Sequence, residues 1–362
     1  METCLSKRAR KRAGNDSLYS ESCILNCKRL RVSTMLLHQA KGYYLEEIVR
    51  ELMRKSKFVD VQTGNIEGRG ADHQIDSYGT FMFTIPFVYP VRLISEVKWF
   101  SRNYKVQLSH MRSFAGVMID ISQNYFVPRA MRSAGRNRQA FPIMGRYTDS
   151  GAFFSATGFS WDAQNYAWAH GIYLIPFSNN RFLQPILSRV DSLLRQRNIW
   201  SNSRLRKSDV ISMASSDFHK DPELHSLIKR VIAYIGILDG MYPVVLLTDR
   251  EFSFDPRGPD DLARNDLSFD ENTAFKEGRV EREGDVSFDF RFGEARFSFS
   301  LPMTTAANII QAIESTYGGE AFASLDIPIV LETETGRYRR IFKVRLALPY
   351  RSDMVRALKE TM

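Results

Sequence analysis

The chain is 362 residues long, is 44% hydrophobic and carries a net charge of +9 at neutral pH. Its length exceeds that of one average domain, so two domains are expected, and the lack of any apolar run of about eighteen residues excludes a membrane-spanning segment. All three cysteines lie at or before Cys27, and no apolar stretch follows the basic residues near the N-terminus, so neither a disulfide-built fold nor a secretory signal is expected. These features favour a cytoplasmic protein whose positive charge suits a polyanionic partner.

A basic segment precedes the organised part of the sequence. Residues 1–35 are rich in Lys and Arg and predict a disordered tail. Helical spacing of apolar residues follows it, so residues 36–55 predict an amphipathic helix. The apolar positions of this helix are Leu45, Ile48, Val49 and Leu52.

Strand and turn patterns follow this helix. The predicted elements are a short strand over residues 58–62, a turn-rich loop over residues 64–70, and a hairpin of strands 80–87 and 91–99 that turns between Pro86 and Pro90.

Two acids and a lysine stand out around this hairpin. Glu96 is the only acid in the chain with a lysine, Lys98, two residues after it. The period of two along a strand puts Glu96 and Lys98 on one face. An antiparallel hairpin that folds between Ser77 and Ser95 brings Asp76 alongside Glu96. The sequence therefore predicts that two carboxylates and an ammonium meet at one point.

This set of side chains has two interpretations. Two carboxylates can hold a hard divalent cation through oxygen ligands and position a water to attack a phosphodiester. The alternative is a salt bridge at a strand end, because an acid and a lysine beside apolar residues avoid a burial cost of several kcal/mol by pairing. Spacing alone does not decide between them.

The middle of the chain alternates helix and strand patterns, which indicates an α/β architecture with partly parallel pairing. The predicted elements are a crossover helix over residues 105–115 ended by Gly116, strands over residues 117–127, 151–155 and 172–175, and a helix over residues 160–170. Residues 128–146 contain no acid and hold several arginines, which predict either a phosphate clamp or a solvated loop. These arginines include Arg129, Arg132, Arg136 and Arg138.

The second half has a different pattern. Residues 179–204 predict a helical linker, whose apolar face over residues 179–200 either joins the domains or mediates a homodimer, and residues 205–362 predict an α+β domain. Its expected elements are a helix over residues 222–238, a strand over residues 242–247, an acidic turn-rich segment over residues 255–283, a hairpin around Gly293, a helix over residues 304–317 and a second hairpin of residues 327–332 and 340–348.

The motif Asp76…Glu96-Val97-Lys98 resembles the signature of PD-(D/E)xK nucleases, with Ile75 in place of the proline. Further stretches are similar to the Mrr-type branch of the restriction-endonuclease-like proteins: residues 42–49, 70–76, 116–121, 153–167 and 170–175. The resemblance implies that residues 36–178 form a nuclease domain. Its fold would be an α/β restriction-endonuclease-like core, with a mixed central sheet flanked by helices.

The resemblance also implies a chemistry. Asp76 and Glu96, helped by the Val97 carbonyl, would hold Mg²⁺ or Mn²⁺. Lys98 would orient or deprotonate the attacking water, provided that burial lowers its pKa. Glu46 on the first helix is either an outer ligand or a surface glutamate.

Two further residues follow from the same chemistry. Gln107 and Arg112, on the helix after the motif, are expected to contact phosphate.

The expected activity is cleavage of double-stranded DNA, as defence against foreign or modified DNA. Two alternatives stay open. The chain could be a DNA- or partner-binding protein on an inactive nuclease-like core, or a structure-selective resolvase acting on branched DNA. A possible homodimer also follows, because cutting both strands with one metal site per subunit favours two subunits.

Overall fold

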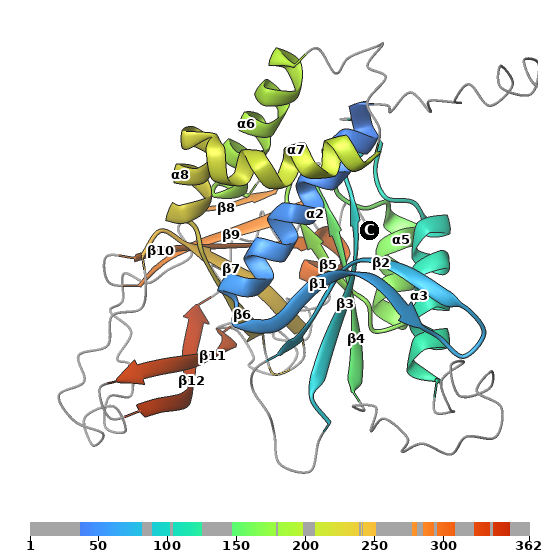
Figure 1. The fold of residues 1–362 in the computed structure, drawn as a ribbon. Helices are drawn as coiled ribbons and strands as arrows, with labels where there is room; N and C mark the ends of the chain where they lie inside the picture. The colour runs from blue at the N-terminus through green and yellow to red at the C-terminus, as the bar shows by residue number, and fades with distance from the viewer. Residues whose placement is uncertain are drawn as a thin grey trace, which may run out of the picture.

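The structure is a computed structural model. It describes residues 37–81, 89–101, 104–124, 147–178, 180–197, 207–238, 240, 242–250, 277–280, 285–292, 295–307, 322–333 and 336–347. Within these segments the chain forms two β-sheets, one of five strands and one of seven, with helices packed around them (Figure 1).

The five-stranded sheet has a mixed topology. Its strands are β1 (Phe58–Glu67), β2 (Asp72–Phe81), β3 (Val91–Lys98), β4 (Thr148–Ser155) and β5 (Tyr173–Pro176), in that spatial order. The pairs β1–β2 and β2–β3 are antiparallel, whereas β3–β4 and β4–β5 are parallel. Parallel neighbours need a crossover, and here helices α3 (Leu108–Ser122) and α5 (Trp161–Ala169) supply it. The predicted α/β class with a mixed, helix-flanked sheet is confirmed.

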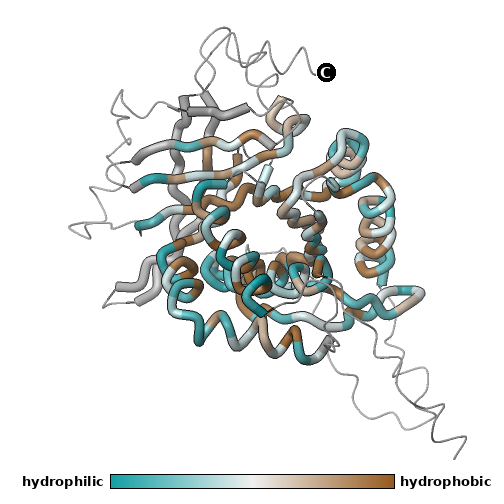
Figure 2. Tube along the Cα trace, turned by 90° about the horizontal axis from the view of Figure 1, so that it is seen from above, coloured by the Kyte–Doolittle hydropathy of each residue, from teal (hydrophilic) through white to brown (hydrophobic). Residues whose placement is uncertain are grey.

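Helices cover both faces of this sheet. Helix α2 (Leu37–Lys55) packs on one face, and α3 and α5 pack together on the other (Figure 1). Neighbouring residues of β4 show the division, because Phe154 belongs to the buried cluster on the α2 side and Phe153 to the cluster under α3 and α5. Figure 2 shows that apolar and polar residues alternate along the helices.

Three further helices follow the first sheet. They are α6 (Leu183–Gln196), α7 (Lys207–Lys220) and α8 (Pro222–Arg230). The apolar face of α6 is buried in the same cluster as α2, so it packs within the chain and is not exposed for a dimer. None of the helices in the described segments has the length and apolar character needed to cross a bilayer.

The second sheet is antiparallel throughout its described strands. They are β6 (Ile232–Leu238), β7 (Tyr242–Thr248), β8 (Glu277–Val280), β9 (Asp285–Phe292), β10 (Ala295–Pro302), β11 (Phe322–Thr333) and β12 (Gly336–Ala347), in the order β12-β11-β6-β7-β10-β9-β8. The two hairpins predicted for this half are confirmed as β9–β10 and β11–β12.

The two sheets share contacts across the predicted domain boundary. The Leu174 backbone N–H donates to the Tyr242 hydroxyl at 3.0 Å, and the Thr304 N–H donates to the Gln164 side-chain oxygen at 2.9 Å. Residues of α7, α8, β6 and β7 belong to the same buried cluster as α2. The halves therefore pack against each other over a common core.

A buried polar contact also joins α2 to α7. The Tyr44 hydroxyl donates to Asp217, which also forms an ion pair with Arg197 at 2.5 Å. Burial, followed by the contact with Asp217, raises the pKa of Tyr44. A hydroxyl that is buried with a carboxylate partner fixes the position of α2 against the second half.

Helix α3 is longer than predicted. The sequence predicts that Gly116 ends a helix and that a strand covers residues 117–127, but α3 continues to Ser122. Met111, Phe114, Ala115 and Ile121 are buried along one side of it, and this packing outweighs the cost of one glycine inside a helix.

Other boundaries also differ from the prediction. The predicted helix 222–238 is instead α8 followed by β6, because Val231 has an extended backbone and the β-branched residues after it pair with β7. The predicted loop 64–70 is mostly strand, with β1 reaching Glu67 and β2 starting at Asp72. Residues 82–88, 125–146 and 308–321 lie outside the described residues. They contain parts of the predicted strands 80–87 and 117–127, the arginine segment and most of the predicted helix 304–317.

The β1–β2 turn is fastened to the end of α3. The Asp120 carboxylate accepts hydrogen bonds from the Gly70 N–H at 2.9 Å and the Ala71 N–H at 3.2 Å, and it contacts His73 Nε2 at 2.7 Å. The hydrogen bond with His73 is the main cause that lowers the pKa of Asp120. This turn leads directly into β2, which carries Asp76.

Candidate active site

The β2–β3 pairing has the predicted register. Ser77 is the partner of Ser95 in an antiparallel ladder. Asp76 precedes the first residue of this pair and Glu96 follows the second, so the two acids lie beside each other on neighbouring strands.

The three predicted site residues come together. The Lys98 Nζ lies 2.5 Å from Glu96 Oε1 and 3.6 Å from Asp76 Oδ2. The Asp76 Oδ2 atom also accepts a hydrogen bond of 2.9 Å from the Val97 backbone N–H. All three side chains are partly buried, with exposed fractions of 19% for Asp76, 26% for Glu96 and 30% for Lys98. Two carboxylates and an ammonium therefore meet at one point.

The electrostatics of this group follow from its closeness and burial. Burial raises the pKa of Glu96, and the negative charge of Asp76 raises it further against the opposing effect of Lys98. Burial by itself lowers the pKa of Lys98, but the charges of Glu96 and Asp76 outweigh it and raise that pKa overall. The expected lowering of the Lys98 pKa is therefore wrong for this arrangement, because two carboxylates stabilise the ammonium.

The group opens into a cavity of about 340 Å³ between α2 and the strands β2 and β3. The residues that line it are His38, Gln39, Gly42, Tyr43, Glu46, Gln74, Asp76, Glu96, Val97, Lys98, Trp99 and Phe100. The cavity contains Glu46, which the sequence placed near the site.

Arg50 connects α2 to the acidic strand. Its guanidinium lies 3.8 Å from Glu46, forms an ion pair with Glu47 and donates a 3.3 Å hydrogen bond to the Asp76 backbone carbonyl. The side chain is only 10% exposed. A buried guanidinium with these partners holds the helix and β2 in a fixed relation at the site.

The donor set fits a magnesium-type ion. In the described part of the chain no three His, Cys, Asp or Glu side chains are arranged to hold a metal. Mg²⁺, however, is typically bound through one or two carboxylates, with water and substrate phosphate filling the other positions. Asp76 and Glu96 supply two hard oxygen donors, and a cation between them would relieve their mutual repulsion, which adds to burial in raising the Glu96 pKa.

Neither Gln107 nor Arg112, which were predicted to contact DNA, lines this cavity. The side-chain amide of Gln107 donates to the Lys105 carbonyl at 3.0 Å, at the start of α3. Arg112 is exposed on α3, with its guanidinium 5.9 Å from the centre of the Tyr166 ring. The other predicted contacts, Arg129, Arg132, Arg136 and Arg138, lie outside the described residues.

Sequence reasoning missed two residues that line the cavity beside the acids. Gln74 lies two residues before Asp76 on β2, and Tyr43 lies three residues before Glu46 on α2. The period of two in a strand and the i, i+3 spacing of a helix place each of them beside a predicted site residue. These two spacings were the available signal. The strand spacing could be applied to Gln74 only if β2 was known to begin at Asp72.

No protein-family model and no curated protein matches this chain. A search of solved structures finds a crystal structure of a protein of unknown function, with 16% sequence identity and a TM-score of 0.27, over 48% of this chain and 96% of that one.

Proposed function

We propose that this chain is a metal-dependent endodeoxyribonuclease that hydrolyses phosphodiester bonds of duplex DNA. The observation that carries the proposal is the meeting of Asp76, Glu96 and Lys98 at one cavity, with the Lys98 ammonium within 3.6 Å of both carboxylates. The net charge of +9 supports a polyanionic substrate. Resemblance to the PD-(D/E)xK signature supports the reaction and a defence role against foreign or modified DNA.

Each residue has a distinct role in this proposal. Asp76 and Glu96, with the Val97 carbonyl, would hold Mg²⁺ or Mn²⁺. The ion, when bound, supplies positive charge to the phosphate oxygens. Lys98 donates hydrogen bonds that orient the attacking water and offsets charge on the scissile phosphate. The raised pKa of Lys98 favours this orienting role over that of a proton acceptor.

One observation favours a second candidate. Lys98 pairs with both carboxylates, which is also the arrangement of a structural salt bridge. The alternative is therefore a DNA-binding protein whose nuclease-like core does no chemistry.

Incubation of supercoiled plasmid with the protein and Mg²⁺ separates the two candidates. We expect nicked and linear products that disappear in Asp76→Ala and in Lys98→Ala. The exposed residues Asp162 and Lys229 provide the matched controls Asp162→Asn and Lys229→Met, which should cut like the wild type. Intact plasmid with Mg²⁺ and with Mn²⁺, together with a metal-independent gel shift, would instead establish the binding protein.

Two further substrates refine the activity. Methylated and unmethylated plasmids compared at equal enzyme concentration reveal any dependence on base modification. A four-way junction cut in preference to a linear duplex would replace the endonuclease proposal with the structure-selective resolvase.

A further inference from the structure

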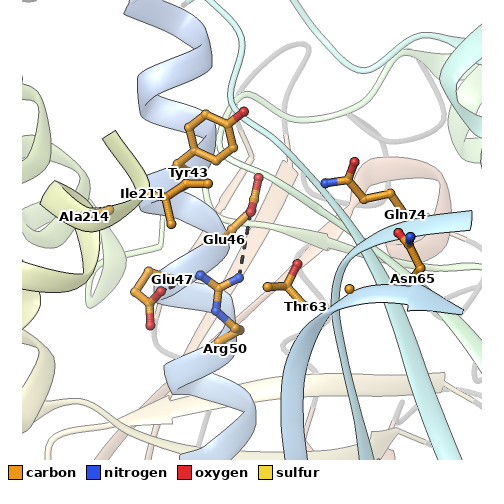
Figure 3. A pocket seen from close by; sticks show the side chains of 10 residues that line it. Tyr43, Glu46, Glu47, Arg50, Thr63, Asn65, Gln74, Ile211 and Ala214 are labelled. Atoms are coloured by element: carbon orange, nitrogen blue, oxygen red, sulfur yellow. Dashed lines mark hydrogen bonds and ion pairs between the residues drawn. The ribbon is translucent and has the colours of Figure 1, made fainter. Parts of the chain in front are cut away.

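A second cavity of about 220 Å³ adjoins the candidate active site (Figure 3). The two cavities share Tyr43, Glu46 and Gln74 as lining residues. The second one extends between α2, the β1–β2 pair and α7, where Asn65 and Ile211 also line it. Its volume is below the roughly 300–1,000 Å³ of pockets for drug-sized ligands, so it suits a single ring system.

The second cavity is lined by two carboxylates and one guanidinium, so its charged side chains leave one negative charge in excess. Arg50 pairs with Glu46 at 3.8 Å and with Glu47, as the dashed lines in Figure 3 mark. A phosphate would meet two carboxylates whose cationic partner is engaged, and a cation would compete with Arg50 for them. A polar, uncharged ligand avoids both conflicts.

Hydrogen-bonding groups line the strand side of the cavity. Asn65 on β1 is the register partner of Gln74 on β2, and both side chains extend from their strands toward α2 (Figure 3). Both residues are exposed to solvent, and neither amide hydrogen-bonds another group among the residues that the structure describes. Each offers a donor and an acceptor, the combination that reads the edge of a nucleobase.

The helix side of the cavity is more apolar. Tyr43 on α2 and Ile211 on α7 lie next to each other in Figure 3, and the Ile211 side chain is 41% exposed. An aromatic ring and an aliphatic side chain are the surfaces between which a planar base is held when it leaves a helical stack.

We infer that this second cavity is a subsite for one unstacked DNA base. The base next to the phosphodiester at Asp76, Glu96 and Lys98 enters it, packs against Tyr43 and Ile211, and presents its edge to Asn65 and Gln74. This inference rests on the proposed function, because the shared lining residues put the base close to the phosphate that would react. Extracting a base is easiest where it is unpaired or mispaired, so duplexes with such a base are the preferred substrate class.

Binding without cleavage tests this subsite. Metal-free protein in EDTA is titrated into three end-labelled duplexes of equal length: one fully paired, one with a single bulged 2-aminopurine, and one with an abasic site at the bulge. We expect the bulged base to bind at least about fivefold more tightly than the abasic site, as base stacking on side chains provides. The emission of 2-aminopurine should change on binding.

Matched variants locate the effect. Ile211→Ser removes the aliphatic surface and Asn65→Leu removes an amide, so each should abolish the preference for the bulged base over the abasic site. Ile119→Ser is the control, because Ile119 is 48% exposed on α3 and does not line the cavity. Circular dichroism confirms that each variant is folded.

The outcomes separate this inference from the proposed function. Equal affinity for the bulged base and the abasic site, or a preference that survives both variants, would overturn the subsite even if plasmid is cut. A preference that depends on Ile211 and Asn65 supports the subsite even if plasmid stays intact, in which case only the nuclease proposal fails.

Discussion

The Asp76 carboxylate accepts a hydrogen bond of 2.9 Å from the backbone N–H of Val97, the residue between Glu96 and Lys98. One side chain thus fastens β2 to β3 and also presents a negative charge to the candidate site. Substitutions at position 76 can separate the two roles.

Asp76→Asn keeps an oxygen acceptor and removes the charge, whereas Asp76→Ala removes both. We expect either change to reduce plasmid cleavage at least about a hundredfold, as loss of one charge-stabilising group does in other enzymes. Only the alanine variant should also lose about 1–3 kcal/mol of unfolding free energy, because the buried Val97 N–H is left unpaired. Urea denaturation gives the stabilities, and equal values for both variants would show that the Val97 contact contributes nothing.

Arg50→Met should destabilise the protein by about 3 kcal/mol, because it removes the buried guanidinium that two partly buried carboxylates share. The matched control is Arg54→Met on the same helix. The Arg54 side chain is 46% exposed and also faces Glu47, at 3.9 Å. Its loss should cost under about 1 kcal/mol, as for other surface ion pairs. Chemical denaturation measures both, and similar losses would contradict the structural role given to Arg50.

Substitution by alanine should have opposite effects on stability at Gly68 and at Gly116. A Cβ at Gly68 would lie 2.1 Å from Asp120 Oδ2 and 2.8 Å from the Ala71 carbonyl, so Gly68→Ala should cost about 1–3 kcal/mol. A Cβ at Gly116 meets nothing within 4 Å, so Gly116→Ala inside α3 should stabilise by about 0.5–1 kcal/mol. Thermal unfolding reports both, and a destabilised Gly116→Ala would mean that α3 does not continue through this position.

The ion pair between Arg189 and Asp221 should make the stability of the protein depend on pH. The hydrogen bond from Arg189, at 2.6 Å, is the main cause that lowers the pKa of Asp221 in the folded protein. The unfolded carboxyl protonates near pH 3.9, whereas the folded one stays ionised to lower pH. Its stabilising contribution is therefore complete above about pH 4 and is lost as the pH falls through the folded pKa.

Asp221→Asn isolates this contribution, because asparagine can still accept the Leu224 N–H that starts α8. We expect a loss of about 1 kcal/mol at pH 7 that shrinks below about pH 4. The control is Glu223→Gln, since Glu223 also pairs with Arg189 but is 61% exposed. Denaturant titrations over pH 2.5–7 measure the difference, and a constant loss across that range would rule out the ion pair as its source.

The arrangement of the candidate site could be predicted because its determinants are local. The period of two and one assumed hairpin are enough to place Asp76, Glu96 and Lys98 together, and the Ser77–Ser95 pairing has that register. The predicted end of α3 was wrong because Gly116 looks like a helix end in the sequence. Its exposed position and the buried Ile121 beyond it are features of tertiary packing.

The second cavity could not be predicted for a different reason. Its walls include Tyr43 on α2 and Ile211 on α7, and no periodic pattern links positions so far apart in the chain. The pKa of Lys98 was also missed, because burial alone predicts a decrease and only the distances to both carboxylates reverse it.

The contact between Tyr44 and Asp217 has a consequence for folding during synthesis of the chain. The two residues are 173 positions apart in the chain. At roughly 5–20 residues per second, a ribosome needs about 9–35 s to synthesise the chain from the first residue to the second. For that time the apolar side of α2 lacks the covering that α7 provides, so nascent chains should depend on chaperones until translation passes Lys220.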